Sequence, residues 1–186
     1  MKLLAIESSG LVASAAVFAD DTIVAEFTVN NKQTHSQTLL PMIDQVVTMS
    51  GIDLKEIDAI ATTSGPGSFT GLRIGAATAK GLGLALHKPI VPITTLEELA
   101  FRLAGREGNI CPMMDARRNQ VYAGVYRVGD MLLECVTGQK AVSIEDYIAE
   151  LNDLGDPVTV LGDGVPVHRE ALQQGLNVAW QDALPI

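Results

Sequence analysis

Glycine recurs through residues 64–83 in two patterns that restrict the fold. An apolar run at 57–63 predicts a strand, and Ser-Gly-Pro-Gly-Ser-Phe-Thr-Gly follows it at 64–71. The helix predicted next, over about 70–86, repeats small residues on one face at every fourth position: Gly71, Gly75, Ala79 and Gly83. Each glycine costs a helix about 1 kcal/mol relative to alanine. That cost indicates a close approach on this face, either by the chain's own sheet or by a helix of another subunit.

The glycine loop before this helix is the strongest local motif. Backbone amides at a strand-to-helix turn can hold an anion. The candidate anion-, nucleotide- or partner-contact residues are Gly65, Gly67, Ser68, Thr70, Gly71 and Arg73. A P-loop would need lysine directly after Gly71, where Leu72 stands. The dinucleotide fingerprint would need its third glycine one residue earlier. The spacing therefore favours a tight turn that packs the helix on its sheet.

The order of the predicted elements indicates two α/β lobes. Runs at 2–8, 12–19 and 22–29 predict an antiparallel meander of three strands, the third with Ile23, Ala25, Phe27 and Val29 on one face. A helix at 37–50, the strand at 57–63, the helix at 70–86, a strand at 90–93 and a helix at 95–106 follow. The order then repeats, with strands at 110–115, 120–128 and 131–136, a helix at 143–151, a strand at 158–161 and a helix at 167–174. We expect mixed sheets in an N-terminal lobe, 1–105, and a smaller second lobe, 106–186.

Charge and hydropathy exclude several classes of protein. The net charge of −9 argues against direct binding of nucleic acid, because an acidic surface repels phosphates. The longest stretch with few polar residues, 74–86, is too short for a membrane span. The four-residue apolar run before Glu7 is too short for a signal peptide, which predicts a cytoplasmic protein. Apolar neighbours around Cys111 and Cys135 predict two buried free thiols.

Candidate catalytic groups are few. A helical zinc pair with His35 would need a ligand at 38 or 39, where Thr38 and Leu39 stand, so no metal site is expected. Glu7 ends the first strand, but only Ser-Ser-Gly follows it as a phosphate turn. No serine-hydrolase elbow occurs in the sequence. We therefore assign no catalytic residue.

A second contact candidate lies in the turn after the strand at 110–115. Asp115, Arg117 and Arg118 could contact an anion or a partner protein, or could form a local salt-bridged turn.

Several of these motifs together resemble the TsaB (YeaZ) family, in order along residues 3 to about 165. They are the blocks at 4–9 (LAIESS), 35–41 (HSQTLLP), 64–75 (SGPGSFTGLRIG), 114–122 (MDARRNQVY) and 162–164 (GDG). The block at 64–75 is the most specific. The resemblance implies a two-lobed fold of the actin/sugar kinase/Hsp70-like (ASKHA) type. It also implies a part in the formation of threonylcarbamoyladenosine beside the tRNA anticodon.

The family resemblance implies a non-catalytic subunit that binds and activates the catalytic paralogue TsaD. Leu39 here replaces the second histidine of the paralogue's HxxxH pair, and His35 matches the first. Further implied partners are the ATPase TsaE and a second copy of the chain. No cofactor is expected on this chain alone, although a nucleotide could lie at the interface of the complex. The interface helices would carry Leu39, Leu40, Ile43 and Val47 on one side and Gly75, Ala79 and Gly83 on the other.

Three alternatives stay open from the sequence. The family is classed by descent beside the M22 glycoproteases, so one alternative is a metal-dependent peptidase. Another is a small ASKHA phosphotransferase, and a third is a homodimeric binding module unrelated to tRNA. Family members usually continue past residue 186 with a helix that packs on the first lobe. The resemblance therefore leads us to expect a truncated chain or a lost tail.

Overall fold

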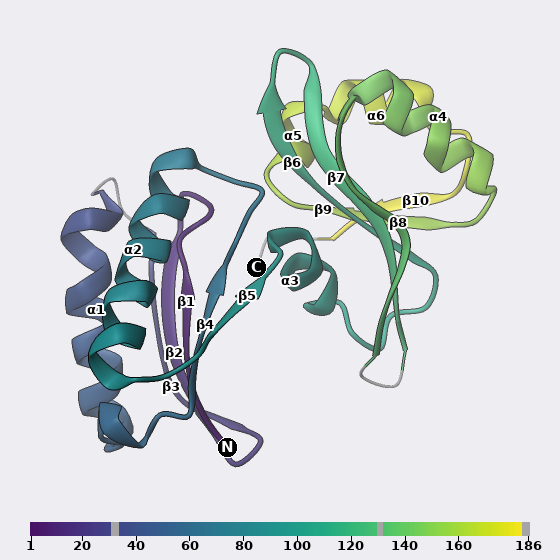
Figure 1. Cartoon of the computed structure of the whole chain (residues 1–186). Helices are drawn as coiled ribbons and strands as arrows, with labels where there is room; N and C mark the ends of the chain where they lie inside the picture. The colour runs from purple at the N-terminus through teal and green to yellow at the C-terminus, as the bar shows by residue number, and fades with distance from the viewer. Residues whose placement is uncertain (31–33, 130–131, 184–186) are drawn as a thin grey trace. The chain divides into compact units, whose positions relative to one another are not determined.

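The computed structural model describes residues 1–30, 34–129 and 132–183 and divides the chain into two compact units (Figure 1). The first unit is Met1–Thr95 and the second is Leu96–Ile186. The sequence analysis placed this boundary after residue 105. The structure places it earlier because α3 (Thr95–Phe101) packs in the second unit, where Leu96 and Ala100 share a core with Ile110.

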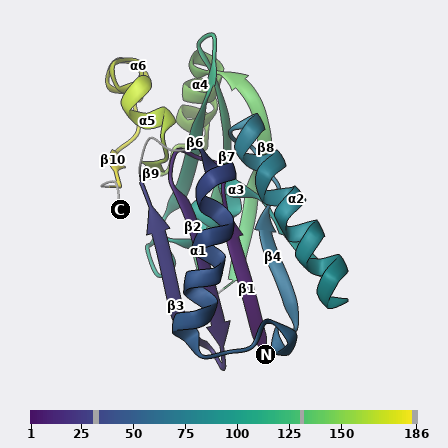
Figure 2. The same ribbon diagram turned by 90° about the vertical axis from the view of Figure 1, so that its left-hand side faces the viewer.

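The first unit is a five-stranded mixed sheet with its two long helices on one face (Figures 1 and 2). The strand order is β3-β2-β1-β4-β5, with β1, β2 and β3 antiparallel and β4 and β5 parallel to β1. The elements are β1 (Lys2–Glu7), β2 (Ala13–Ala19), β3 (Thr22–Val29), α1 (His35–Ser50), η1 (Leu54–Glu56), β4 (Ala59–Thr63), α2 (Phe69–Leu86) and β5 (Ile90–Ile93). The predicted meander is confirmed.

A bulge in β3 changes the predicted face of one residue. Val17 of β2 pairs with Ala25, but the next residue, Phe18, pairs with Ile23. Val24 is therefore the extra residue of a β-bulge. Because Phe18 and Val17 point to opposite faces of the sheet, Ile23 does not share the face of Ala25 and Phe27. The predicted grouping of Ile23 with these residues is wrong, since simple alternation cannot reveal a bulge.

Helix α1 begins at His35, two residues before the predicted start, and Pro41 lies inside it. Its inner face buries Leu39, Met42, Ile43 and Val46 in a core with Leu4 and Ile60 of the sheet. Gly51 ends the helix in the left-handed conformation, with φ of 68°, as its position predicts. The apolar spacing therefore predicted the buried side of α1 correctly, and Pro41 does not interrupt the helix.

The second unit repeats the strand arrangement of the first. Its order is β8-β7-β6-β9-β10, in which β6, β7 and β8 are antiparallel and β9 and β10 are parallel to β6. The elements are β6 (Asn109–Arg117), β7 (Gln120–Gly129), β8 (Leu132–Ser143), α4 (Ile144–Leu154), β9 (Val158–Leu161), α5 (Gly164–Val167), α6 (Arg169–Gly175) and β10 (Trp180–Asp182). The predicted fold of two α/β lobes with mixed sheets is confirmed.

Several details of the second unit differ from prediction, including helix α3, which ends at Phe101 and not at 106. Strand β8 continues to Ser143, and β10 was not predicted at all. The predicted start of β8 at 131 and its turn residue 130 lie outside the described residues. Cys111 is buried as predicted, but Cys135 is exposed, because it lies on the outer strand β8. Within the described ranges, no helix is both long and apolar enough to cross a membrane.

Candidate functional site

The glycine loop joins the carboxyl end of β4 to α2 in the first unit. Gly65 and Gly67 have φ of 107° and 156°, and the bond between Gly65 and Pro66 is cis. Ser68 is the N-cap of α2, and its hydroxyl accepts a hydrogen bond from the Gly71 amide at 3.3 Å. The loop is therefore a strand-to-helix turn of the predicted kind, with a serine cap.

The loop glycines are required by close packing on the end of β1. A Cβ on Gly67 would collide with the carbonyl oxygen of Ser9, and one on Gly71 with that of Ser8. A Cβ on Gly75 would collide with the Ser8 hydroxyl. The close approach indicated by the sequence is thus made by the chain's own sheet.

Several backbone amides of the glycine loop and the start of α2 donate hydrogen bonds within the chain. The Ser68 amide donates to the Ser9 carbonyl at 2.6 Å, and the Leu72 amide donates to the Ser68 carbonyl at 2.8 Å. Ser8 closes the other side, because its buried hydroxyl donates to the Gly71 carbonyl at 3.0 Å. Two of these bonds, from the Ser68 amide and from the Ser8 hydroxyl, therefore join the start of α2 to the segment that follows β1.

The remaining loop candidates face outward. Thr70 and Arg73 are exposed, and the Arg73 guanidinium lies 3.8 Å from the centroid of the Phe69 ring, itself 68% exposed. A guanidinium over an aromatic face is attractive and is worth about 0.5–1 kcal/mol at exposed sites. Arg73 and Phe69 thus form an ordered, outward-pointing pair at the start of α2.

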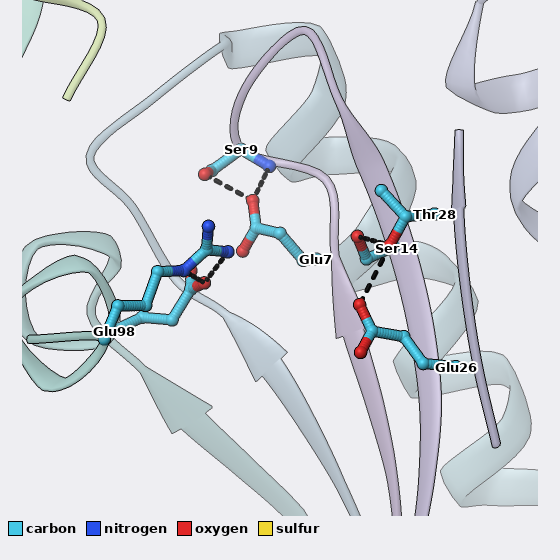
Figure 3. Close-up of polar contacts among 7 residues, drawn as sticks. Glu7, Ser9, Ser14, Glu26, Thr28 and Glu98 are labelled. Atoms are coloured by element: carbon cyan, nitrogen blue, oxygen red, sulfur yellow. Dashed lines mark hydrogen bonds and ion pairs between the residues drawn. The ribbon is translucent and has the colours of Figure 1, made fainter. Parts of the chain in front are cut away.

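Glu7 is turned back onto its own strand end. Figure 3 shows one of its carboxylate oxygens accepting hydrogen bonds from both the amide and the hydroxyl of Ser9. The other oxygen, Oε2, is buried without a hydrogen-bond partner, as are the hydroxyls of Thr63 and Thr95. This carboxylate therefore anchors the same Ser9 that receives the Ser68 amide, which gives it a structural role.

His35 also makes a structural contact. Its Nε2 is 2.9 Å from the Gly10 carbonyl oxygen. Leu39, one turn later, is 1% exposed and belongs to the core. Among the described residues, no group of three or more His, Cys, Asp or Glu side chains could hold a metal ion.

The structure separates the predicted interface residues into inner and outer sets. Leu39 and Ile43 are 1% and 3% exposed, and Val47 packs against the same core. On α2, Gly75, Ala79 and Gly83 are buried. A Cβ on Gly83 would lie 3.1 Å from Ile90 of β5, so this stripe also faces the chain's own sheet.

Of the predicted interface residues, only Leu40 is clearly exposed, at 57%. The buried members pack inside the unit, so the apolar and small-residue spacing marks inner faces here, and the interface itself stays a prediction. The outer sides of α1 and α2 carry other residues. We call the set of Leu40, Phe69, Arg73, Ala77 and Leu84 the helical face, because all five are exposed on these two helices.

In the second unit, Asp115 and Arg117 form the local ion pair that was one of the two predicted outcomes. The Asp115 carboxylate accepts from the Arg117 amide at 3.0 Å and lies 3.7 Å from its Nε. Arg117, Arg118 and Asn119 all have φ between 52° and 68°, which the hairpin turn requires. Arg118 is exposed.

The sequence analysis did not assign a role to Asp163 or His168, which lie beside Asp115. Asp163 accepts from the Asp115 amide at 3.2 Å, and burial raises the pKa of its carboxyl group. His168 is 7% exposed, and its Nε2 lies 3.8 Å from the Asp115 carboxylate. The Gly162-Asp163-Gly164 turn was the available signal, since glycine there allows close approach to the Met113 carbonyl.

Comparisons with known proteins show which family the chain is similar to. Residues 22–181 match the family described as TsaD, tRNA N6-adenosine threonylcarbamoyltransferase. The chain is 34% identical over 177 residues to the tRNA threonylcarbamoyladenosine biosynthesis protein TsaB of Bacillus subtilis, covering 95% of this chain and 77% of that one. It is 39% identical over 127 residues to the Haemophilus influenzae protein of the same name, covering 66% and 52%.

Solved structures extend the comparison to the fold. A Pseudomonas aeruginosa protein described as similar to peptidase YeaZ superposes with a TM-score of 0.83 at 27% identity, covering 98% of this chain and 84% of that one. The ethanolamine utilization protein EutJ of Carboxydothermus hydrogenoformans shares the fold at 12% identity, with a TM-score of 0.55 and coverage of 99% and 85%. The predicted ASKHA fold is confirmed, and the chain belongs to the TsaB (YeaZ) family.

Proposed function

We propose that this chain is a non-catalytic subunit that binds a related tRNA N6-adenosine threonylcarbamoyltransferase and supports threonylcarbamoyl transfer to a tRNA adenosine. The helical face carries this proposal. It presents large apolar side chains on two neighbouring helices, with Leu84 78% exposed and Phe69 68% exposed. Exposed apolar surface of this kind is typical of protein–protein interfaces.

The residues where the chemistry would be expected support a non-catalytic role. His35 faces the Gly10 carbonyl, and Leu39 fills the core where the family's catalytic members have a second histidine. Glu7 holds Ser9 at the end of β1. These groups stabilise the first unit, and none of them is arranged as an acid, a base or a metal ligand.

The glycine loop supports the proposal that this chain binds no nucleotide by itself. The amides of Ser68, Gly71 and Leu72 already donate within the chain. An anion at these three amides would have to replace these bonds, and Arg73 is an outward cation near the same helix start. We therefore place any nucleotide at an interface with a partner, where Arg73 could reach it. TsaE and a second copy of this chain remain further proposed partners.

A reconstituted assay of tRNA modification tests the proposal. Formation of threonylcarbamoyladenosine would be measured with the partner transferase, its ATPase and the substrates held constant, with and without this chain. The proposal expects product only when the chain is present. A Leu40→Asp, Leu84→Asp double variant should abolish the stimulation, whereas Leu132→Asp, an equally exposed change in the second unit, should retain it.

Two results would overturn the proposal. Product formation that is unaffected by omitting the chain would remove the supporting role. Peptide or nucleotide hydrolysis by the purified chain alone, lost on substitution of Glu7 or His35, would favour one of the enzymatic alternatives.

A further inference from the structure

Strand β3 is an exposed edge of the first sheet (Figure 2). It pairs with β2 on one side, and on the other side no strand of the described residues pairs with it. Proteins usually protect such edges with lysine, proline or a covering segment, because unpaired backbone groups bind other strands. The eight residues of β3 contain neither lysine nor proline. This edge therefore has the features of a strand-docking site.

A groove lies beside this edge, between β3 and α1. Its volume is about 580 Å³, and its walls are Val24, Ala25, Glu26, Phe27, Gln45, Val46 and Met49. Phe27 is 42% exposed and Met49 is 73% exposed, so the groove presents large apolar side chains. Because the bulge brings Val24 to the groove wall beside Ala25, it widens the apolar lining.

The opposite face of the same strand carries Glu26 and Thr28, together with the exposed Ile23 that the bulge places there. Glu26 pairs with Ala16, and Thr28 pairs with Ser14. The Thr28 hydroxyl donates to the Glu26 carboxylate at 2.9 Å and lies 2.9 Å from the Ser14 hydroxyl. Figure 3 draws both contacts as dashed lines. An added strand would therefore meet apolar side chains on one face and a carboxylate on the other.

The charge around β3 favours a basic occupant over a second copy of the chain. The sequence contains no lysine or arginine between Lys2 and Lys32, but contains Glu7, Asp20, Asp21 and Glu26 there. Helix α1 adds Asp44 and no lysine or arginine. Two copies paired along β3 would bring their Glu26 carboxylates onto one small sheet surface, on chains that each carry a net charge of −9. Like charges on facing strands destabilise the pairing.

We propose that β3 and the β3–α1 groove bind an extended segment of a partner protein in which large apolar residues alternate with lysine or arginine. Such a segment adds a strand through main-chain hydrogen bonds. Its apolar side chains enter the groove beside Phe27 and Met49, and its cations lie on the face of Glu26. This surface is separate from the helical face, so it does not depend on the function proposed above.

Defined peptides test the proposal with the chain as it exists. The probe is a fluorescent seven-residue peptide with the order Lys-Val-Lys-Phe-Lys-Val-Lys. One control peptide has Glu at every Lys position, and another keeps the composition but groups the apolar residues together. Fluorescence anisotropy measures binding at low salt and again at ~0.3 M salt, where screening is strong.

We expect the alternating basic peptide to bind with a Kd below about 1 mM and more weakly at high salt, and the two control peptides to bind at least ~10-fold more weakly. Phe27→Lys and Met49→Lys should each reduce the affinity for the basic peptide about tenfold or more. Each variant removes an apolar contact and adds a positive charge that repels the lysines of the peptide. Leu132→Lys, at a similarly exposed site of the second unit, is the matched control and should bind normally.

Three outcomes would overturn the proposal. They are absence of binding at about 1 mM peptide, equal binding of the basic and acidic peptides, and unchanged binding in both groove variants. Analytical ultracentrifugation of the chain without peptide measures whether it is a monomer or a dimer. A dimer that dissociates on Phe27→Lys and Met49→Lys substitution would assign the groove to a second copy instead. Circular dichroism of both variants verifies that they are folded.

Discussion

The two units have the same strand order but expose very different surfaces. Of the fifteen large apolar side chains that are exposed in the described residues, twelve lie in Met1–Thr95 and three lie in the second unit. In the second unit, ion pairs join several elements, including Lys140 with Glu150 and Arg127 with Asp156. The same topology therefore exposes many large apolar side chains in one unit and few in the other.

The two units also differ at the corresponding connection after the fourth strand. In the first unit β4 leads through the glycine loop into the 18-residue helix α2, whereas in the second β9 leads into α5 and α6, of four and seven residues. The longer helix gives the first unit an outer face with Phe69, Arg73 and Leu84, which is the face we propose binds a partner. The glycine stripe lets that helix lie close to its sheet.

Overpacking the α2 contact should have the largest effect. Gly71→Val forces a side chain into the Ser8 carbonyl, so we expect a loss of about 3 kcal/mol in the free energy of unfolding. Denaturant titration followed by circular dichroism measures this loss. Fluorescence of Trp180, the only tryptophan, follows the second unit in the same titration.

A matched change on the same helix is the control for Gly71→Val. Gly81 is exposed with nothing within 4 Å of an added Cβ, so Gly81→Ala should stabilise the chain by about 1 kcal/mol. Equal effects of the two substitutions would contradict the account of the stripe.

Removal of one buried hydrogen bond in each unit should have a smaller and similar effect. The Tyr147 hydroxyl donates to the Gly124 carbonyl at 2.9 Å, and the Ser8 hydroxyl donates to the Gly71 carbonyl at 3.0 Å. Tyr147→Phe and Ser8→Ala should each cost about 1–2 kcal/mol, because a buried carbonyl loses its donor. Thermal unfolding of both variants measures the costs. A neutral Ser8→Ala would show that this bond does not help to fasten α2.

The pH dependence of stability should identify Asp163, whose carboxyl group is desolvated in part although the residue is exposed. Burial raises its pKa above the ordinary value of 3.8, so the folded state binds a proton more tightly than the unfolded state. Stability contributed by this group is therefore lost as pH rises above 3.8 through the pKa of the folded state. Asp163→Asn should flatten this fall in denaturation experiments, with Asp153→Asn on α4 as the comparison variant.

Cysteine labelling should give the smallest effect on stability and a clear difference in rate. Burial raises the pKa of Cys111 to about 12, whereas Cys135 is exposed. Iodoacetamide at neutral pH should therefore alkylate one thiol in the native chain and both in denaturant. Mass spectrometry identifies the site, and Cys135→Ser should remove the native reaction. Rapid native labelling of Cys111 would contradict its buried position.

The spacing of apolar residues and the positions of glycines predicted most of the fold, because both depend on which side of an element is buried. Apolar spacing identified α1 and α2, and glycine identified the tight turn before Phe69. The same patterns could not predict β10, because its three residues acquire strand structure only by pairing with β9. The bulge at Val24 depends likewise on the register with β2.

The candidate site was less predictable than the fold. Small and apolar residues at helical spacing indicated that something packs against them, but not whether it was the same chain or a partner. Leu39 and Gly75 pack inside the first unit, whereas Phe69 and Leu84, outside the predicted set, are exposed. Their exposure depends on how both helices are oriented on the sheet, which only the tertiary structure shows.

Direct binding of the partner transferase is the measurement that tests the central claim. Isothermal titration calorimetry would compare the wild type, the Leu40→Asp, Leu84→Asp variant and the Leu132→Asp variant for binding to the threonylcarbamoyltransferase of the same organism. The account predicts one-to-one binding for the wild type and Leu132→Asp, and at least ~100-fold weaker binding for the helical-face variant, because charged groups would be buried in an apolar interface. Equal affinities for all three proteins, or no binding by the wild type, would contradict it.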